Sequence, residues 1–333
     1  MESPFVPSKN HFAANEEPPK SYREFISTLP RTKGWNAEDD LYHYQGFWFH
    51  PTFLDGIMSA QDYFKAQPSD ILICSTPRSG TTWLKALAFA IVTRNSFDDS
   101  TSPLLSKVPH DCVPFVEMDL SHGSSARDPE MPLLATHIPF SSLPKSVLES
   151  GCRIVYICRN SKDAFVSMFH FARRLEIQRN LEPLSLEEVF ELFCEGKCHY
   201  GPQWDHVLGY WRASLERPEK ILFLKYEEVK EDTGVYVKKL AEFIGCPFSP
   251  EEEETGAVEK IVKMCSFENL SNLEVNKTGK HREDTPVSIQ NKVFFWKGKI
   301  GEWENHLTPE MAARLDRITE QKLGNSGLNL VRH

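Results

Sequence analysis

The segment TPRSGTTW, residues 76–83, has the residue types and spacing that suit the binding of a phosphate group. It joins an apolar run, which predicts a buried strand, to a helical pattern over residues 81–94. Gly80 would let the backbone approach a ligand closely, and the two threonines after it add hydroxyl donors. Because a helix N-terminus presents unpaired N–H groups and the positive end of a dipole, the junction predicts a phosphate-binding loop.

This loop resembles a P-loop but departs from the pattern GxxxxGK[ST]: the first glycine is absent, and Thr81 stands at the lysine position. Taken alone, the segment fits a tight strand-to-helix turn without a ligand equally well. An ATP- or GTP-dependent kinase is disfavoured because the lysine is missing and no apolar strand ends convincingly in a magnesium-binding aspartate.

Three further apolar runs each end at a side chain that could contact an anionic ligand. The runs and the residues that follow them are 132–136 with His137, 152–158 with Arg159, and 221–225 with Tyr226. In an open α/β sheet, ligands bind beyond the carboxyl ends of parallel strands. We therefore expect the loop, an imidazole, a guanidinium and a phenol at one edge of a sheet, although each residue alone also fits a core or surface position.

Strands and helical patterns alternate along the chain, which predicts an α/β fold with a mainly parallel sheet flanked by helices and a P-loop-like phosphate site. The first strand is expected at residues 71–75, and the sequence Ser185 to Glu188 predicts a capping box. Helices are expected over 81–94, 162–175, 185–196, 249–254 and 307–315. No repeat or low-complexity linker interrupts the chain, so residues 21–333 are expected to form a single domain after a flexible N-terminal arm at 1–20.

The charge and composition of the chain limit the kinds of partner and the cellular location that we expect. The formal net charge of −9 gives no general support to nucleic-acid binding. The sequence contains no apolar run of the roughly 20 residues needed to cross a bilayer, and its first residues have no signal-peptide pattern. The eight cysteines form no CxxC pair, and Cys194, Cys198 and His199 have no second ligand pair. We therefore expect reduced thiols, no metal site, no membrane association and a cytoplasmic location.

Several segments, taken in chain order, resemble cytosolic sulfotransferases. TPRSGTTW resembles their 5′-phosphosulfate loop, ATHIPFSSLP the segment with their catalytic histidine, and CRNSKDAFVS their 3′-phosphate-binding segment. ILFLKYEEVKED and WKGKIGEWENHLT resemble two later family segments, and the likeness covers roughly residues 40–320. YQGFW, GPQWDHVLGYW and CSFENLSNLEVNK look like the plant branch, close to enzymes that act on flavonols and hydroxyjasmonate.

The resemblance implies transfer of a sulfuryl group from 3′-phosphoadenosine 5′-phosphosulfate (PAPS) to a hydroxyl of a small plant metabolite such as a flavonoid or hydroxyjasmonate, without a metal. His137 would be the general base that takes the acceptor proton, and Arg78 would act at the leaving group. The residues implied at the nucleotide are Arg78, Ser79, Gly80, Thr81, Thr82, Trp83, Arg159, Ser167, Tyr226, Trp296, Lys297 and Gly298. The candidates for the acceptor pocket are Phe47, Trp48, Phe115, Phe169 and Phe171, each of which also fits a core position.

The sequence departs from the family pattern in two important places. Arg78 replaces a lysine that contacts the oxygen bridging phosphate and sulfate, and an arginine hardly ever gives up a proton. Trp296 replaces an arginine expected at the 3′-phosphate, and Glu302 replaces an aspartate, which is a milder change. These departures keep open an alternative, a catalytically weakened relative that binds the nucleotide or a metabolite. The sequence fixes neither the acceptor nor the oligomeric state.

Overall fold

A four-stranded parallel sheet forms the centre of the protein, in a computed structural model that describes residues 22–36, 39–120, 127–128, 130–283, 285 and 288–331. The strands are β4 (Ile71–Ser75), β5 (Leu133–Thr136), β6 (Arg153–Cys158) and β7 (Ile221–Lys225), in the order β5-β4-β6-β7. All three neighbouring pairs run parallel. The four strands predicted from apolar runs are confirmed to within one residue. The arm expected at residues 1–20 lies outside the described residues.

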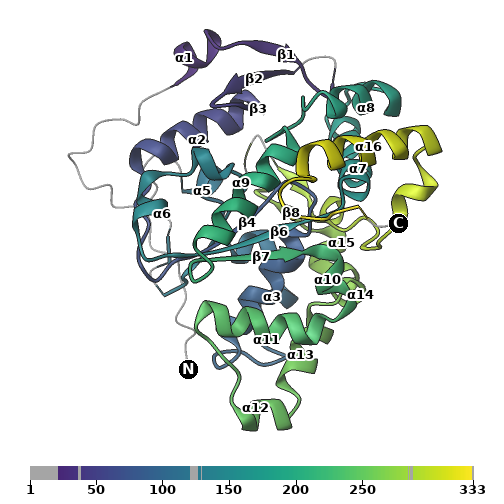
Figure 1. Cartoon of the computed structure of the whole chain (residues 1–333). Helices are drawn as coiled ribbons and strands as arrows, with labels where there is room; N and C mark the ends of the chain where they lie inside the picture. The colour runs from purple at the N-terminus through teal and green to yellow at the C-terminus, as the bar shows by residue number, and fades with distance from the viewer. Residues whose placement is uncertain are drawn as a thin grey trace.

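The sheet is apolar on both faces, as a parallel sheet covered on both sides must be. Alternate residues of β4 enter different cores: Ile71 and Ile73 belong to one apolar cluster, and Leu72 and Cys74 to the other. Helices α3 (Thr81–Thr93), α11 (Thr233–Ile244) and α13 (Ala257–Met264) cover the first face, below the sheet in Figure 1. The helices that cover the other face are α2 (Pro51–Tyr63), α7 (Ser161–Gln178), α8 (Leu186–Cys194), α9 (Gln203–Glu216) and α16 (Pro309–Leu323).

The predicted helix starts are present. Ser185 caps α8 in a capping box with Glu188, and Ser249 caps α12 (Pro250–Glu254) in the same way. Thr308 caps α16, which continues eight residues beyond the predicted end at residue 315. Local hydrogen-bonding signals therefore located these helices well, because a side-chain cap depends on neighbours in the sequence.

Two small antiparallel sheets were not predicted. The first contains β1 (Arg31–Lys33), β2 (Asp40–Tyr44) and β3 (Phe47–Phe49), and the second contains β8 (Lys280–His281) and β9 (Ile289–Gln290). The remaining elements are α1 (Arg23–Ser27), α4 (Pro109–Cys112), α5 (Val116–Asp119), α6 (Lys145–Glu149), α10 (Tyr226–Glu231), α14 (Phe267–Asn272), α15 (Glu274–Thr278), η1 (Pro103–Leu105), η2 (Phe140–Ser142), η3 (Asn291–Phe294) and η4 (Glu302–Asn305). Among the described helices, none combines the length and the apolar character needed to cross a bilayer.

Candidate active site

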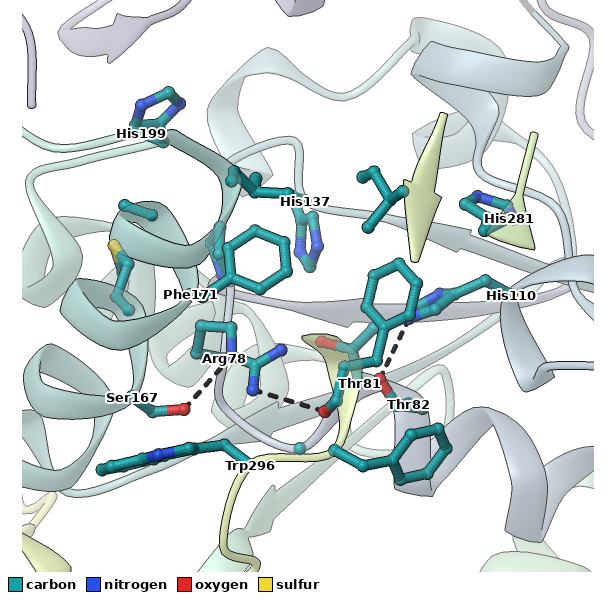
Figure 2. A pocket seen from close by; sticks show the side chains of 18 of the residues that line it. Arg78, Thr81, Thr82, His110, His137, Ser167, Phe171, His199, His281 and Trp296 are labelled. Atoms are coloured by element: carbon teal, nitrogen blue, oxygen red, sulfur yellow. Dashed lines mark hydrogen bonds between the residues drawn. The ribbon is translucent and has the colours of Figure 1, made fainter. Parts of the chain in front are cut away.

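A cavity of about 750 Å³ lies beyond the carboxyl ends of the parallel strands. Its lining includes Arg78 and Gly80 after β4, His137 after β5, Arg159 after β6 and Tyr226 after β7. The structure therefore brings to one cavity the groups that the four strand ends were expected to supply. Figure 2 shows Arg78 and Thr81 from the loop after β4 together with His137 around a common space.

The loop after β4 forms a tight turn that depends on the backbone conformation of Gly80 and on short contacts between hydroxyl groups. Gly80 is the N-cap of α3 with φ of 106°, and a Cβ there would lie 2.7 Å from Cδ2 of Tyr226. No L-residue side chain fits this position. The hydroxyl of Ser79 is 2.6 Å from that of Thr76, so Ser79 is buried inside the loop and does not line the cavity. Thr81 similarly contacts the hydroxyl of Ser75 at 2.7 Å.

Arg78 links three segments around the cavity. Its Nε donates to the hydroxyl of Ser167 on α7 at 3.1 Å, and its Nη2 donates to the carbonyl oxygen of Phe294 at 3.3 Å (Figure 2). The guanidinium carbon also lies 4.8 Å from the ring centroid of Phe171. Burial, and the nearby guanidinium of Arg159, lower the pKa of Arg78 to about 9. Arg78 thus remains a cation at neutral pH, oriented by its contacts with other segments.

His137 is held as a neutral imidazole with a defined tautomer. Its Nδ1 lies 2.8 Å from the carbonyl oxygen of Ser75, which can only accept, so Nδ1 carries the ring proton and Nε2 has a lone pair. The backbone N–H of His137 donates to the buried carboxylate of Glu117 at 2.8 Å. Burial lowers the pKa of His137 to about 3. The ring is therefore in the form that can accept a proton at physiological pH.

Arg159 is buried and only partly paired. Its Nη2 donates to the carbonyl oxygen of Lys299 at 2.7 Å and lies 3.8 Å from the Asp163 carboxylate, and the guanidinium lies 4.6 Å from the ring centroid of Tyr226. Its Nε is buried and has no hydrogen-bond partner among the described residues. Arg159 lines the cavity, so its positive charge suits an anion bound there.

The remaining residues expected at the nucleotide line the same cavity. The ring of Trp296 stacks on His170 with centroids 4.3 Å apart, and Trp83 packs edge-on against Tyr226 at 5.5 Å. Lys297 and Gly298 also line the cavity. Gly298 has φ of 63°, and a Cβ there would collide with the ring of Phe267, so this turn too requires glycine.

The structure places only some of the aromatic candidates for the acceptor pocket in the cavity. Phe115 and Phe171 line the cavity, whereas Phe47, Trp48 and Phe169 do not. On β3, Phe47 faces the core and packs on His206, and Trp48 points to the opposite side against His43. On α7, Ser167 and Phe171 are four residues apart and share a face, so Phe169 between them points elsewhere. The expectation for these three residues is thus corrected by strand alternation and helix geometry.

Several lining residues were missed by sequence reasoning. They include Trp35, His50, Phe53, His199 and Tyr200. The backbone of Trp48 pairs with Tyr200 and Gly201, which joins the N-terminal sheet to the segment before α9. A pairing between segments about 150 residues apart leaves no local signal in the sequence. The buried Lys85 and its neighbour His110 were also missed, although Lys85 is conspicuous as the one charged residue within the apolar pattern of 81–93.

The fold and site define an α/β protein whose parallel strands end at one cavity with a neutral imidazole and two arginines, and comparison with known proteins identifies its family. A model of the sulfotransferase domain matches residues 68–327, so the chain belongs to the sulfotransferase family. It is 52% identical over 310 residues to a flavonol 3-sulfotransferase of Flaveria bidentis, an alignment covering 92% of this chain and 99% of the relative. It is 49% identical over 316 residues to cytosolic sulfotransferase 16 of Arabidopsis thaliana, covering 94% and 93% of the two chains.

A solved structure supports the same assignment. A mouse sulfotransferase in complex with PAP, the desulfated product of PAPS, is 27% identical and superimposes with a TM-score of 0.65. The alignment covers 86% of this chain and 95% of the mouse chain. The sulfotransferase fold predicted from the resemblance is therefore confirmed, and the chain is a sulfotransferase of the kind whose plant members are named cytosolic and flavonol sulfotransferases.

Proposed function

We propose that this protein transfers the sulfuryl group of PAPS to a hydroxyl group of a small plant metabolite in the cytosol. The observation that carries this proposal is the neutral His137. It has a lone pair on Nε2 and lines the same cavity as the loop before α3. A base and an anion-binding loop in one cavity suit a transfer from a phosphosulfate to a hydroxyl group.

His137 and Arg78 would act at opposite ends of the transfer. PAPS supplies the sulfuryl group: the acceptor oxygen forms a bond to sulfur, the S–O bond to the phosphate breaks, and PAP leaves with the electron pair. His137 Nε2 would take the acceptor proton as the new bond forms. Arg78 would stabilise the charge that grows on the leaving oxygen, where a cation acts more strongly on the transition state than on the ground state.

The nucleotide would be held at both of its phosphates. The N–H groups at the start of α3 and the hydroxyls of Thr81 and Thr82 would bind the 5′-phosphosulfate. Arg159 and Ser167 both line the cavity and would bind the 3′-phosphate. Ser167 accepts its hydrogen bond from Arg78, so its own hydroxyl proton remains available for a phosphate oxygen. Both ends of the cavity therefore contain donors that suit a doubly phosphorylated nucleotide.

A flavonoid or hydroxyjasmonate is the acceptor class that we infer. Phe53, Phe115, Phe171 and Tyr200 give the cavity aromatic walls, as a flat phenolic or an apolar alcohol requires. The 52% identity to a flavonol 3-sulfotransferase supports the phenolic case. A second candidate function, binding without efficient turnover, is favoured by Arg78 and Trp296, which stand where the family pattern has lysine and arginine.

The test combines binding with turnover. PAP is expected to raise the melting temperature of the protein, whereas ATP with magnesium is not. Sulfuryl transfer from labelled PAPS would then be measured on a panel of flavonols and on hydroxyjasmonate. His137→Ala should lower kcat by about 10²–10⁴-fold and leave the Kd for PAP nearly unchanged. PAP binding without transfer to any acceptor would favour the second candidate, and stabilisation by ATP alone would refute the proposal.

A further inference from the structure

Lys85 is a fully buried charged residue in α3, one turn after Thr82. Its Nζ lies 2.8 Å from the carbonyl oxygen of Val113 and 3.1 Å from Nδ1 of His110, and it lies 3.3 Å from the ring centroid of Phe115. An ammonium group has three N–H donors, and these neighbours supply two lone pairs and one aromatic face. Burial lowers the pKa of Lys85 well below its usual range, and the nearby carboxylates of Asp119 and Glu117 act against that shift. The carbonyl oxygen, the ring nitrogen and the aromatic face around Nζ suit the ammonium form, which we take Lys85 to adopt.

His110 connects this lysine to the phosphate loop. An ammonium can only donate, so Nδ1 of His110 accepts from Lys85 and the imidazole carries its own proton on Nε2. That Nε2 lies 3.0 Å from Oγ1 of Thr82, and the bond is drawn in Figure 2. Burial and the charge of Lys85 lower the pKa of His110, which keeps its ring neutral. The imidazole therefore donates to Thr82.

Thr82 is the cavity end of this chain of hydrogen bonds. It is the second residue of α3 and lines the cavity, whereas Lys85 does not. Because the Thr82 oxygen accepts from His110, its own proton is available to a ligand. Each bond in such a chain polarises the next, so the buried charge strengthens the last donor.

We propose that Lys85 is a positioning residue that acts through His110 and Thr82 on the 5′-phosphate of the nucleotide. The inference rests on the proposed function, because it takes the 5′-phosphate to lie at the start of α3. It places a second cation behind the loop, in addition to Arg78, and this cation never touches the ligand. It also gives α4, which carries His110, a role in binding the donor nucleotide.

An alternative is that Lys85 merely ties α4 to α3. Loss of such a tie would disturb the loop in general and weaken every nucleotide that binds there. If Lys85 instead acts through a relay of hydrogen bonds from His110 to Thr82, its loss should weaken only ligands that carry a 5′-phosphate. Adenosine 3′-phosphate, which lacks the 5′-phosphate, separates the two roles.

The experiment measures the Kd of PAP and of adenosine 3′-phosphate by calorimetry, in wild type and in Lys85→Met. We expect PAP to bind about tenfold more weakly to the variant, and adenosine 3′-phosphate to bind within twofold of wild type. His110→Phe, which retains a ring beside Phe115 and interrupts the relay, should give the same pattern and serves where Lys85→Met does not fold. Equal weakening of both ligands in the folded variants would show a structural tie and overturn the relay.

A double-mutant cycle gives an independent readout. Thr82→Val removes the last donor, so adding Lys85→Met to it should change the PAP Kd less than twofold further. Thr82→Ser retains a hydroxyl and should preserve the sensitivity to Lys85→Met. Full additivity of the two changes would refute the proposal. Failure of wild type to bind PAP would instead refute the proposed function, so the two failures are distinguishable.

Discussion

The guanidinium of Arg159 donates a 2.7 Å hydrogen bond to the carbonyl oxygen of Lys299, 140 residues further along the chain. The first turn of α7 contributes to the same junction, because the carboxylate of Asp163 accepts from the backbone N–H groups of Gly301 and Trp303. These bonds attach the segment after η3 to the end of β6. The wall of the cavity that faces the 3′-phosphate in our proposal therefore depends on both segments.

The first prediction concerns Arg159. Arg159→Ala should weaken PAP binding by about 2 kcal/mol or more, roughly 30-fold in Kd, because it removes a charged and buried donor. Arg153→Ala is the matched control, since that arginine also bonds a carbonyl oxygen, of Ile244, but starts the same strand at the end away from the cavity. Calorimetry that finds equal PAP affinity in both variants would place the 3′-phosphate elsewhere.

A second prediction concerns Arg78. Arg78→Met keeps a long side chain beside Phe171 but removes the charge, so kcat should fall about 10²-fold while the Kd for PAP changes much less. Arg78→Lys restores the charge and adds a proton that could pass to the leaving group, so its kcat should be at least that of wild type. Steady-state and single-turnover rates would decide. A lysine variant as slow as the methionine variant would mean that the guanidinium fork, which contacts Ser167 and Phe294, is itself required.

A third prediction concerns Trp296. Trp296→Arg adds a cation where the cavity is proposed to hold the 3′-phosphate, and an arginine can stack on the His170 ring as the tryptophan does. PAP should therefore bind severalfold more tightly, and adenosine 5′-phosphate, which has no 3′-phosphate, should not. Titration of both ligands checks this. Looser binding of both would show that the indole is needed for the shape of the loop.

The fourth prediction concerns the pH dependence of stability. Burial lowers the pKa of His137 to about 3 and that of His206 to about 4, compared with about 6.5 in the unfolded chain. The unfolded state therefore binds more protons between pH 6.5 and 4, and the free energy of unfolding should fall as pH falls through that window. Each histidine contributes up to about 1.4 kcal/mol per pH unit.

Urea titrations at pH 7.0 and 5.5 measure that fall. His206→Gln is the control variant, because a glutamine can still accept from the hydroxyl of Tyr156 and donate to the carbonyl oxygen of His137. It should lose less stability than wild type over the same interval. A stability that is unchanged between the two pH values, or a slope unaffected by His206→Gln, would contradict the assignment of these buried neutral rings.

The parallel sheet was predictable because its signals are local. Each strand is a short apolar run, and the residue that directly follows a run must lie at the end of that strand, as His137 and Arg159 do. Helix caps such as Ser185 depend on bonds to residues three positions away. These features need no knowledge of distant contacts.

The acceptor side was less predictable because it depends on pairing between distant segments. Tyr200 reaches the cavity through backbone bonds to Trp48, and nothing near either residue indicates that partner. Phe169 and Phe171 have the same chemistry and differ only in the face of α7 that they occupy. Lys85 gave a local signal, because a charged residue is unusual within an apolar helix. Its partner His110 is 25 residues away, however, and only the structure shows that contact.

The contact between Arg159 and Lys299 has a consequence for how the protein is made. A ribosome has completed all four strands of the parallel sheet by Lys225, but the segment that holds Arg159 emerges about 70 residues later. The side chain of Asn160 in turn donates to the carbonyl oxygen of Leu330, 170 residues further along the chain. In a chain still being synthesised, the sheet can therefore form before this wall of the cavity exists, and a nucleotide bound at Arg159 would stabilise only a chain made beyond Lys299.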